Sequence, residues 1–400
     1  MNKPGSDDRT TEYMKRFQSA LEQRGCRDTM NDKYLNHYTS KIHANALPVK
    51  IALMRSPPNI CVPIRRIPSL TPKSVVDVSD RNLLCMATRG NEVVVGGADH
   101  ALRVFRVSQT SNPRLSRQLY SKRCGHSDWV TTVDFMDDGR VISGGMDSKV
   151  CIWRGVQSKD LTEHAGSVSR VRAVGNKAIV SSSYDRSVKI WCATSGTLLS
   201  SLHGHTGAVL DFVFLEPHCI ATASRDATTR IWDVSKGKLR TTFSGHEGHV
   251  NAILSSSDIL FTGAQDGVVN GWDYRTSKSV FRCTPFPRGT SITLMARSTD
   301  GKRLHVVGSN TGVSTISCDS LRESIAWSGD HETFIYSIYP LPSGEVLTGS
   351  GDGTVVLRGS NGELKTKAKV SDNAIRAIVF TDTGDSLLAT DDGTLITVLT

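Results

Sequence analysis

Hydrophobic and polar positions follow two different patterns along the 400 residues of this chain. In residues 1–72, apolar side chains recur at helical spacing in two short patches. The first patch holds Tyr13, Met14, Phe17, Ala20 and Leu21, and the second holds Met30, Tyr34, Leu35, Tyr38 and Ile42. This spacing predicts two short amphipathic helices. Six prolines from residue 48 to residue 72 exclude a long helix there and favour an extended strap.

From residue 73 to residue 400 the pattern changes to short apolar runs between turns rich in glycine and aspartate. One position near the end of a run can be followed through the whole region, at residues 105, 153, 191, 232, 272, 317, 358 and 398. Self-similarity at about 40 residues is typical of four-stranded units stacked in a ring. We therefore predict an all-β fold, a β-propeller of eight blades. Seven blades is the alternative, with the first or the sixth copy irregular or outside the ring.

The last copy holds three of its four expected strands by residue 400. The segment at residues 73–80 begins with a β-branched run that suits the missing outer strand. Pairing this segment with the last copy would leave no sheet edge open at the seam. The predicted organisation is therefore a basic arm over residues 1–72 and a propeller over residues 73–400, closed by strand 73–80.

Four copies carry a stricter signature, in which an Asp lies six residues before a Trp, with a Ser or Thr four residues before the Asp and a His 20 or 21 residues before it. These residues are His126, Ser143, Asp147 and Trp153; His164, Ser181, Asp185 and Trp191; His205, Thr222, Asp226 and Trp232; and His246, Thr262, Asp266 and Trp272. The signature resembles that of the WD-repeat family. The resemblance implies that each set of four forms a buried hydrogen-bonded chain, here called a tetrad. Its members depend on one another because an unsatisfied buried donor costs about 1 to 3 kcal/mol.

Positive charge is concentrated in the arm. Residues 1–72 hold 12 Lys and Arg against 6 Asp and Glu, while the whole chain has a formal net charge of +9. A basic, amphipathic arm can dock on an acidic surface, for which tubulin, nucleic acid and an acidic protein are all compatible. Its candidate docking residues are Tyr13, Met14, Phe17, Leu21, Tyr34 and Tyr38. The alternative is that both helices fold back on the propeller itself.

Motifs for catalysis, cofactors and metals are lacking in the sequence. It contains no phosphate-binding Gly-x-x-x-x-Gly-Lys loop and no Cys-x-x-Cys pair, and the regularly spaced histidines are assigned to the tetrads. We therefore expect no enzyme activity, no cofactor and no metal. No apolar run approaches the ~20 residues that a membrane helix needs, so no membrane segment is expected. The expected location is cytoplasmic, with a cytoskeletal or ciliary assembly as one setting.

Function on this fold is expected in loop side chains, because the repeated signature serves the blades. The candidate partner-binding residues on the face of the Asp turns are Trp129, Met146, Tyr184, Arg186, Arg225, His249, Gln265 and Phe334. Arg186 and Arg225 could form an anion site or could pair with nearby aspartates. The leading hypothesis is a non-enzymatic scaffold in a multiprotein assembly. The alternatives are a receptor for acidic or phosphorylated peptides in a ubiquitin-ligase or signalling complex, and a ribonucleoprotein component.

Overall fold

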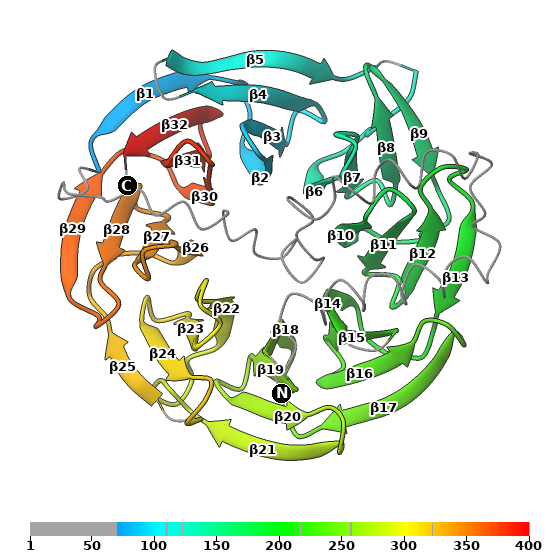
Figure 1. Ribbon diagram of the computed structural model, residues 1–400, viewed down its shortest axis with the longest axis vertical. Helices are drawn as coiled ribbons and strands as arrows, with labels where there is room; N and C mark the ends of the chain where they lie inside the picture. Colours follow the sequence, from blue (N-terminus) through cyan, green and yellow to red (C-terminus); the bar gives the residue numbers. More distant parts are fainter. Residues whose placement is uncertain are drawn as a thin grey trace, which may run out of the picture.

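The computed structural model describes residues 70–108, 111–121, 123–215, 218–256, 258–321 and 323–399. These residues form strands and turns, arranged as eight four-stranded antiparallel sheets around a central axis (Figure 1). The predicted eight-bladed propeller is confirmed, and the alternative of seven blades is wrong. Both predicted helices and most of the predicted strap fall within residues 1–69 and lie outside the described residues.

Blades 1 to 7 each pair their strands in chain order, from the axis outward. Blades 1 to 4 consist of β2 Leu83–Arg89, β3 Glu92–Gly97, β4 Leu102–Ser108 and β5 Ser111–Leu119; β6 Val130–Phe135, β7 Val141–Gly145, β8 Val150–Arg154 and β9 Gln157–Leu161; β10 Val168–Val174, β11 Ala178–Ser183, β12 Val188–Cys192 and β13 Leu198–Leu202; and β14 Val209–Leu215, β15 Cys219–Ser224, β16 Thr228–Asp233 and β17 Lys238–Ser244.

Blades 5 to 7 continue around the ring with the same order, and blade 8 takes β1 as its outermost strand. They consist of β18 Val250–Ser256, β19 Ile259–Ala264, β20 Val269–Asp273 and β21 Lys278–Cys283; β22 Ile292–Arg297, β23 Arg303–Gly308, β24 Val313–Ser317 and β25 Glu323–Trp327; β26 Ile335–Pro340, β27 Val346–Ser350, β28 Thr354–Arg358 and β29 Leu364–Lys369; and β30 Ile375–Phe380, β31 Asp385–Thr390, β32 Thr394–Leu399 and β1 Pro72–Asp77.

The ring closes through β1, which is the outermost strand of blade 8. It pairs antiparallel with β32, in a register that places Val75 opposite Ile396 and Asp77 opposite Thr394. Figure 1 shows β1 and β32 side by side although they come from opposite ends of the described chain. Leu70 lies three residues before the predicted boundary and is buried in the core between blades 7 and 8. The propeller therefore includes Leu70.

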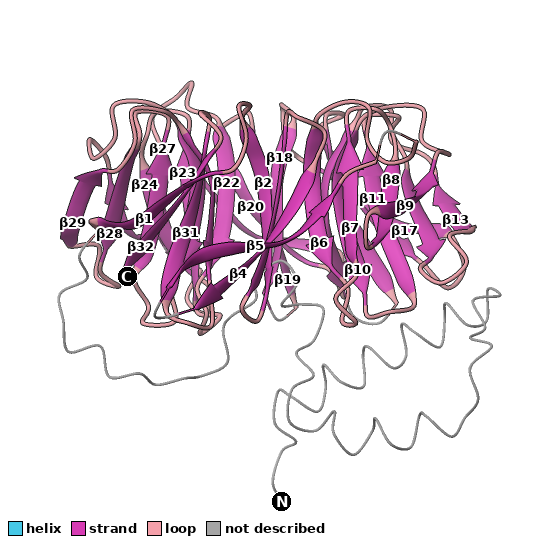
Figure 2. Cartoon of the chain, turned by 90° about the horizontal axis from the view of Figure 1, so that it is seen from above, coloured by secondary structure: helices cyan, strands magenta, loops and turns pink. Residues whose placement is uncertain are grey.

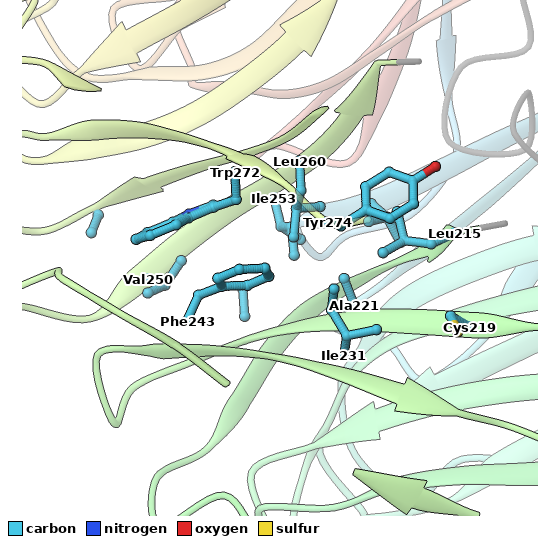
Figure 3. Packing of buried hydrophobic residues seen from close by; sticks show 13 residues of the cluster. Leu215, Cys219, Ala221, Ile231, Phe243, Val250, Ile253, Leu260, Trp272 and Tyr274 are labelled. Atoms are coloured by element: carbon cyan, nitrogen blue, oxygen red, sulfur yellow. The ribbon is translucent and has the colours of Figure 1, made fainter. Parts of the chain in front are cut away.

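The hydrophobic core is divided among the seams between blades, because each blade buries both faces of its inner strands. At the seam between blades 4 and 5, Phe243 stacks on Trp272 with ring centroids 4.9 Å apart, and Leu260 and Ile231 pack beside them (Figure 3). Seen from the side, the loops between the described strands lie at the two ends of the strands (Figure 2). The blades thus form a packed scaffold that presents loops on two faces.

One seam contains a buried histidine. In β23, Leu304 and Val306 pack with blade 5, whereas Val307 packs with blade 7. His305 alternates with Val306 and so faces blade 7. Its side chain is 2% exposed, and its Nδ1 lies 2.9 Å from the Thr315 hydroxyl. Burial, aided by the nearby charge of Arg303, lowers the pKa of His305 to about 4.

This histidine predicts a loss of stability in mild acid. Its folded pKa of about 4 lies below the usual value of 6.5, so the unfolded chain takes up the proton first as the pH falls. The contribution of neutral His305 is complete above pH ~6.5 and declines between that value and its folded pKa. The decrease in unfolding free energy from pH 7 to pH 5 is expected to be smaller in His305→Leu by about 2 kcal/mol. Urea titrations at both pH values measure this difference, and identical decreases in the two proteins would contradict it.

Candidate functional site

The first candidate feature is the set of four tetrads, and the structure brings the four residues together in each of blades 2 to 5. In blade 3, Trp191 donates from Nε1 to the Ser181 hydroxyl at 2.8 Å. That hydroxyl lies 2.8 Å from His164 Nε2, and His164 Nδ1 lies 2.6 Å from Asp185 Oδ2. Asp185 also accepts the backbone N–H of Ala165 at 3.1 Å. This hydrogen-bonded chain runs from the buried third strand of the blade to the loop that leads into its first strand.

In the tetrad of blade 3, the electrostatics favour a neutral histidine and an ionised aspartate. Burial lowers the pKa of His164, and the charge of Asp185 offsets this only in part. Burial also acts to raise the pKa of Asp185, but hydrogen bonds from His164 and Ser187 outweigh it and hold that pKa well below its usual range. With its Nδ1–H donated to Asp185, His164 has Nε2 left to accept from Ser181. Every member is therefore used inside the blade.

Packing explains why a glycine precedes the tetrad histidine in blade 2. Gly125 has φ of +96°, and a Cβ at this position would lie 2.5 Å from Cη2 of Trp153. The backbone therefore passes directly over the indole of the same blade. A side chain here would displace the tryptophan from the position in which it donates to Ser143.

Blade 7 holds a fifth, altered hydrogen-bonded chain that was not predicted from the sequence. His331 Nε2 lies 2.8 Å from the Thr348 hydroxyl, and its Nδ1 lies 2.6 Å from the Thr354 hydroxyl, which donates to Asp352. Arg358 takes the place of the tryptophan and forms a bidentate pair with Asp330 at 2.6 and 2.7 Å. The signal was available, because His331 precedes Asp352 by the same 21 residues as in blade 2.

The eight predicted partner-binding residues are all exposed. They lie at the end of the strands where the Asp turns are, here called the top face. A recurring backbone bond joins two of these positions in a blade, as when Met146 N–H donates to the Trp129 carbonyl and Gln265 N–H to the His249 carbonyl. The same bond joins the backbone of Gly351 to that of Phe334 in blade 7.

Four of these residues form a continuous strip over blades 2 to 4. From Trp129 the contacts pass to Met146, whose carbonyl accepts from Ser167 at 3.2 Å. The Ser167 carbonyl accepts from the backbone of Tyr184, and Arg225 lies over the Tyr184 ring, 4.9 Å from its centroid. Trp129, Met146 and Tyr184 are 43%, 43% and 45% exposed. The top strip, defined as Trp129, Met146, Tyr184 and Arg225, thus offers two aromatic rings, a thioether and a cation to solvent.

The remaining predicted residues lie beside the top strip or away from it. His249 and Gln265 share blade 5, while Phe334 lies across the ring on blade 7 and is 54% exposed. Within the described residues, neither Arg186 nor Arg225 forms an ion pair with a carboxylate. The interpretation that both arginines pair with nearby aspartates is therefore not what the structure shows.

A polar channel on the axis was not predicted from the sequence. A cavity of about 400 Å³ is lined by the innermost strands of the eight blades. In it, Arg170 of β10 pairs with Asp211 of β14 at 3.2 Å, and burial lowers the pKa of Arg172 to about 10. The signal in the sequence was the presence of charged residues in first strands that are otherwise apolar.

For metals and membranes the statements concern only the part of the chain that the structure describes. There, no three His, Cys, Asp or Glu side chains gather to hold a metal ion. The same residues contain no helix long and apolar enough to cross a bilayer. The predicted arm-docking residues lie outside the described ranges.

Comparison with known proteins agrees with this geometry. The family model described as WD domain, G-beta repeat matches residues 117–154, 155–192, 196–233 and 237–273, which include all the residues of the four tetrads. The crystal structure of the computationally designed Ika8 protein superposes with a TM-score of 0.72 at 22% identity, covering 83% of this chain and all of that one. The architecture is that of an eight-bladed propeller. The chain therefore contains four WD repeats within an eight-bladed β-propeller.

Its similarities to individual natural proteins are short. It is 38% identical over 69 residues to the ribosome biogenesis protein YTM1 of Candida glabrata, which is 16% of this chain and 15% of that protein. It is 30% identical over 108 residues to the ribosome biogenesis protein WDR12 homolog of Dictyostelium discoideum, 24% of this chain and 23% of that one. Protein tipD of the same organism matches at 26% over 159 residues, which are 38% of this chain. The chain thus spans less than a quarter of the length of the first two relatives.

Proposed function

We propose that this protein is a non-enzymatic scaffold of a multiprotein assembly and that the top strip is where a partner protein docks. The observation that carries this is the strip itself, which continues across three blades through Trp129, Met146, Tyr184 and Arg225. Tryptophan, tyrosine and arginine are the residue types that most often dominate interface energies. WD-repeat propellers generally bind other proteins, and the tetrads leave the loop side chains free for this role.

The equivalent positions of other blades support a specific surface. Where blade 2 has Trp129 and Met146, blade 1 has Asn82 and Ala98, and blade 6 has Ser291 and Ser309. At these paired positions of the described residues, Trp and Tyr occur only in the sector of blades 2 and 3, and Phe occurs only at Phe334. A partner that covers this sector would remove aromatic rings from water while the scaffold remains rigid.

We expect the double variant Trp129→Ala and Tyr184→Ala to lose its partner. Two buried interface aromatics contribute about 2 kcal/mol or more each, so the retained amount of partner should fall at least about tenfold. The measurement is affinity purification of the tagged full chain with quantitative mass spectrometry. The stability of the variant should stay within about 1 kcal/mol of the wild type, because both side chains are largely exposed.

The matched control removes exposed apolar side chains from the outer strands. Leu239 on β17 and Val280 on β21 are 44% and 43% exposed, so Leu239→Ala with Val280→Ala deletes similar groups elsewhere. The control should retain the partner. Equal losses in the two double variants, or none in either, would contradict docking at the top strip.

The basic arm at residues 1–72 enters the same proposal as the segment that addresses the scaffold to an acidic surface. Its charge supports this, with 12 basic against 6 acidic residues. Tubulin remains one compatible surface. The expected location is cytoplasmic, and a cytoskeletal or ciliary assembly is one setting that such an arm suits.

A ribonucleoprotein role is the second candidate function. Two of the similar proteins are named for ribosome biogenesis, and the chain has a formal net charge of +9. Binding to RNA would weaken steeply with salt, because counterions are released from phosphates. Two results together would favour this candidate. The wild type would purify with no protein partner, and RNA would co-purify with the double variant Trp129→Ala and Tyr184→Ala in a salt-sensitive manner.

A receptor for acidic or phosphorylated peptides, in a ubiquitin-ligase or signalling complex, is a narrower form of the leading proposal. It is favoured by Arg186 and Arg225, which lack carboxylate partners among the described residues. In this form the partner of the top strip would present an anionic side chain to Arg225.

A further inference from the structure

A cluster of arginines surrounds a single carboxylate at the bottom of blade 1. Glu92 begins β3, and its carboxylate lies 3.5 Å from Arg89 Nη1, 3.7 Å from Arg106 Nε and 3.6 Å from Arg117 Nη2. Arg114 of β5 is the neighbour of Arg106 across the strands. The bottom cluster, defined as Arg89, Arg106, Arg114, Arg117 and Glu92, therefore carries four positive charges and one negative charge.

The strand register explains why the charges gather. Glu92 of β3 is paired with Arg106 of β4, and Arg106 is paired with Arg114 of β5. Like charges directly opposite each other in a sheet are unfavourable. The arrangement thus carries an electrostatic cost that an added anion would relieve.

Two of the arginines are already held and two are open. Arg89 donates to the Asp137 carbonyl of blade 2 at 2.8 Å, and Arg117 is 3.5 Å from the Gly139 carbonyl. In contrast, the side chain of Arg106 is 74% exposed, and Arg114 is exposed without a carboxylate partner among the described residues. Arg106 and Arg114 are therefore the groups available to a ligand.

A hollow accompanies the open pair. It has a volume of about 520 Å³ and is lined by Glu92, Arg106, Val107, Arg114 and Leu115, among others. Leu115 is 53% exposed. The hollow thus combines guanidinium groups with an apolar surface, a combination that suits a peptide with acidic side chains and aliphatic stems.

We propose that the bottom cluster binds an acidic segment of a partner protein, with carboxylates of the segment pairing with Arg106 and Arg114 beside Glu92. Glu92 begins its strand, whereas the Asp turns follow the other end of β3, so this surface lies at the opposite end of blade 1 from the top face. It is a second docking surface, independent of the top strip, and goes beyond the proposed function.

The surroundings favour a peptide over nucleic acid. The hollow has no aromatic side chain in its lining on which a base could stack, although single-stranded nucleic acid sites usually provide one. Acidic groups lie within the cluster and beside it. Glu92 belongs to the cluster, and Asp382 of blade 8 lies beside Gly90, in the turn between β2 and β3. A long phosphate backbone would meet these carboxylates, whereas a short acidic segment fits between them.

The test measures fluorescence anisotropy of a labelled hexaglutamate peptide with the full-length chain. The double variant Arg106→Gln and Arg114→Gln should bind the peptide about tenfold more weakly at roughly 0.1 M salt. The control Lys238→Gln and Lys278→Gln removes the same charge from exposed positions on β17 and β21, and should bind like the wild type. Because every variant keeps the basic residues 1–72, the difference between variants reports the cluster.

A second variant tests the same surface from the opposite direction. Glu92→Gln removes the resident carboxylate and should tighten binding of hexaglutamate several-fold; unchanged or weaker binding would overturn the proposal. Equal affinity of the wild type and of the double variant Arg106→Gln and Arg114→Gln for the peptide would also overturn it. The same holds if this double variant binds an oligouridine RNA more weakly than the wild type does but binds the peptide equally well. Trp129→Ala with Tyr184→Ala should bind hexaglutamate normally, so failure here leaves the top strip untouched.

Discussion

Replacing Trp191 with alanine is expected to lower the free energy of unfolding by about 3 to 5 kcal/mol. The indole is 1% exposed, packs in the core between blades 2 and 3, and donates to Ser181. Its removal leaves a cavity and takes away the hydrogen bond that the Ser181 hydroxyl accepts. It also removes the edge contact with the His164 ring at 6.0 Å. The change in urea midpoint followed by circular dichroism measures the effect.

Trp129 provides the matched control in the same chain. It is the same residue type but 43% exposed on the top face, so Trp129→Ala should cost less than about 1 kcal/mol. A comparable loss of stability in both variants would contradict the assignment of one tryptophan to the blade and the other to a docking surface.

A fragment that starts at residue 79 is expected to lose the closed ring. It lacks β1, so β32 becomes an exposed edge and Leu70, which is 1% exposed, no longer fills the core between blades 7 and 8. The lost burial and strand pairing together amount to about 5 kcal/mol or more. A fragment of residues 70–400 keeps both features and should remain monomeric and folded.

Thermal unfolding and size-exclusion chromatography compare the two fragments. Aggregation of the 79–400 fragment is expected, because an unpaired strand edge is a template for association. Equal melting temperatures and elution volumes would show that β1 does not close the ring. In the full chain, Leu70→Ala should lower stability by about 2 to 4 kcal/mol, which separates the packing of Leu70 from the strand pairing.

The sequence was sufficient for the fold because each blade repeats its own local signals. Spacing marked four copies of the signature, and the resemblance to the WD-repeat family implied that each copy forms a tetrad. The last copy ends near Val398, which indicated that its outer strand must come from elsewhere in the chain. Blade 7 was recognised by its turn, whereas its buried hydrogen-bonded chain was missed although His331 and Asp352 have the spacing of the other tetrads. There, Arg358 replaces the tryptophan. The Thr354 hydroxyl bridges His331 to Asp352, and His331 Nδ1 lies 3.9 Å from Asp352 Oδ1.

Features that depend on register or on radial position could not be predicted in this way. The bottom cluster joins residues of β2, β3, β4 and β5 that only strand pairing brings together, and the channel arginines are identified by facing the axis. The continuity of the top strip likewise depends on contacts between blades, such as Arg225 over Tyr184. Exposure of single loop residues was predictable, whereas their grouping was not.

The central claim is that a partner protein covers the top strip, and site-specific photo-crosslinking tests it most directly. A photo-crosslinking phenylalanine analogue is placed at Trp129 in one full-length protein and at Leu239, on outer strand β17, in another. After irradiation in cells, we predict a protein crosslinked to position 129 that is absent at position 239. Crosslinks from position 239 with none from position 129 would contradict the claim.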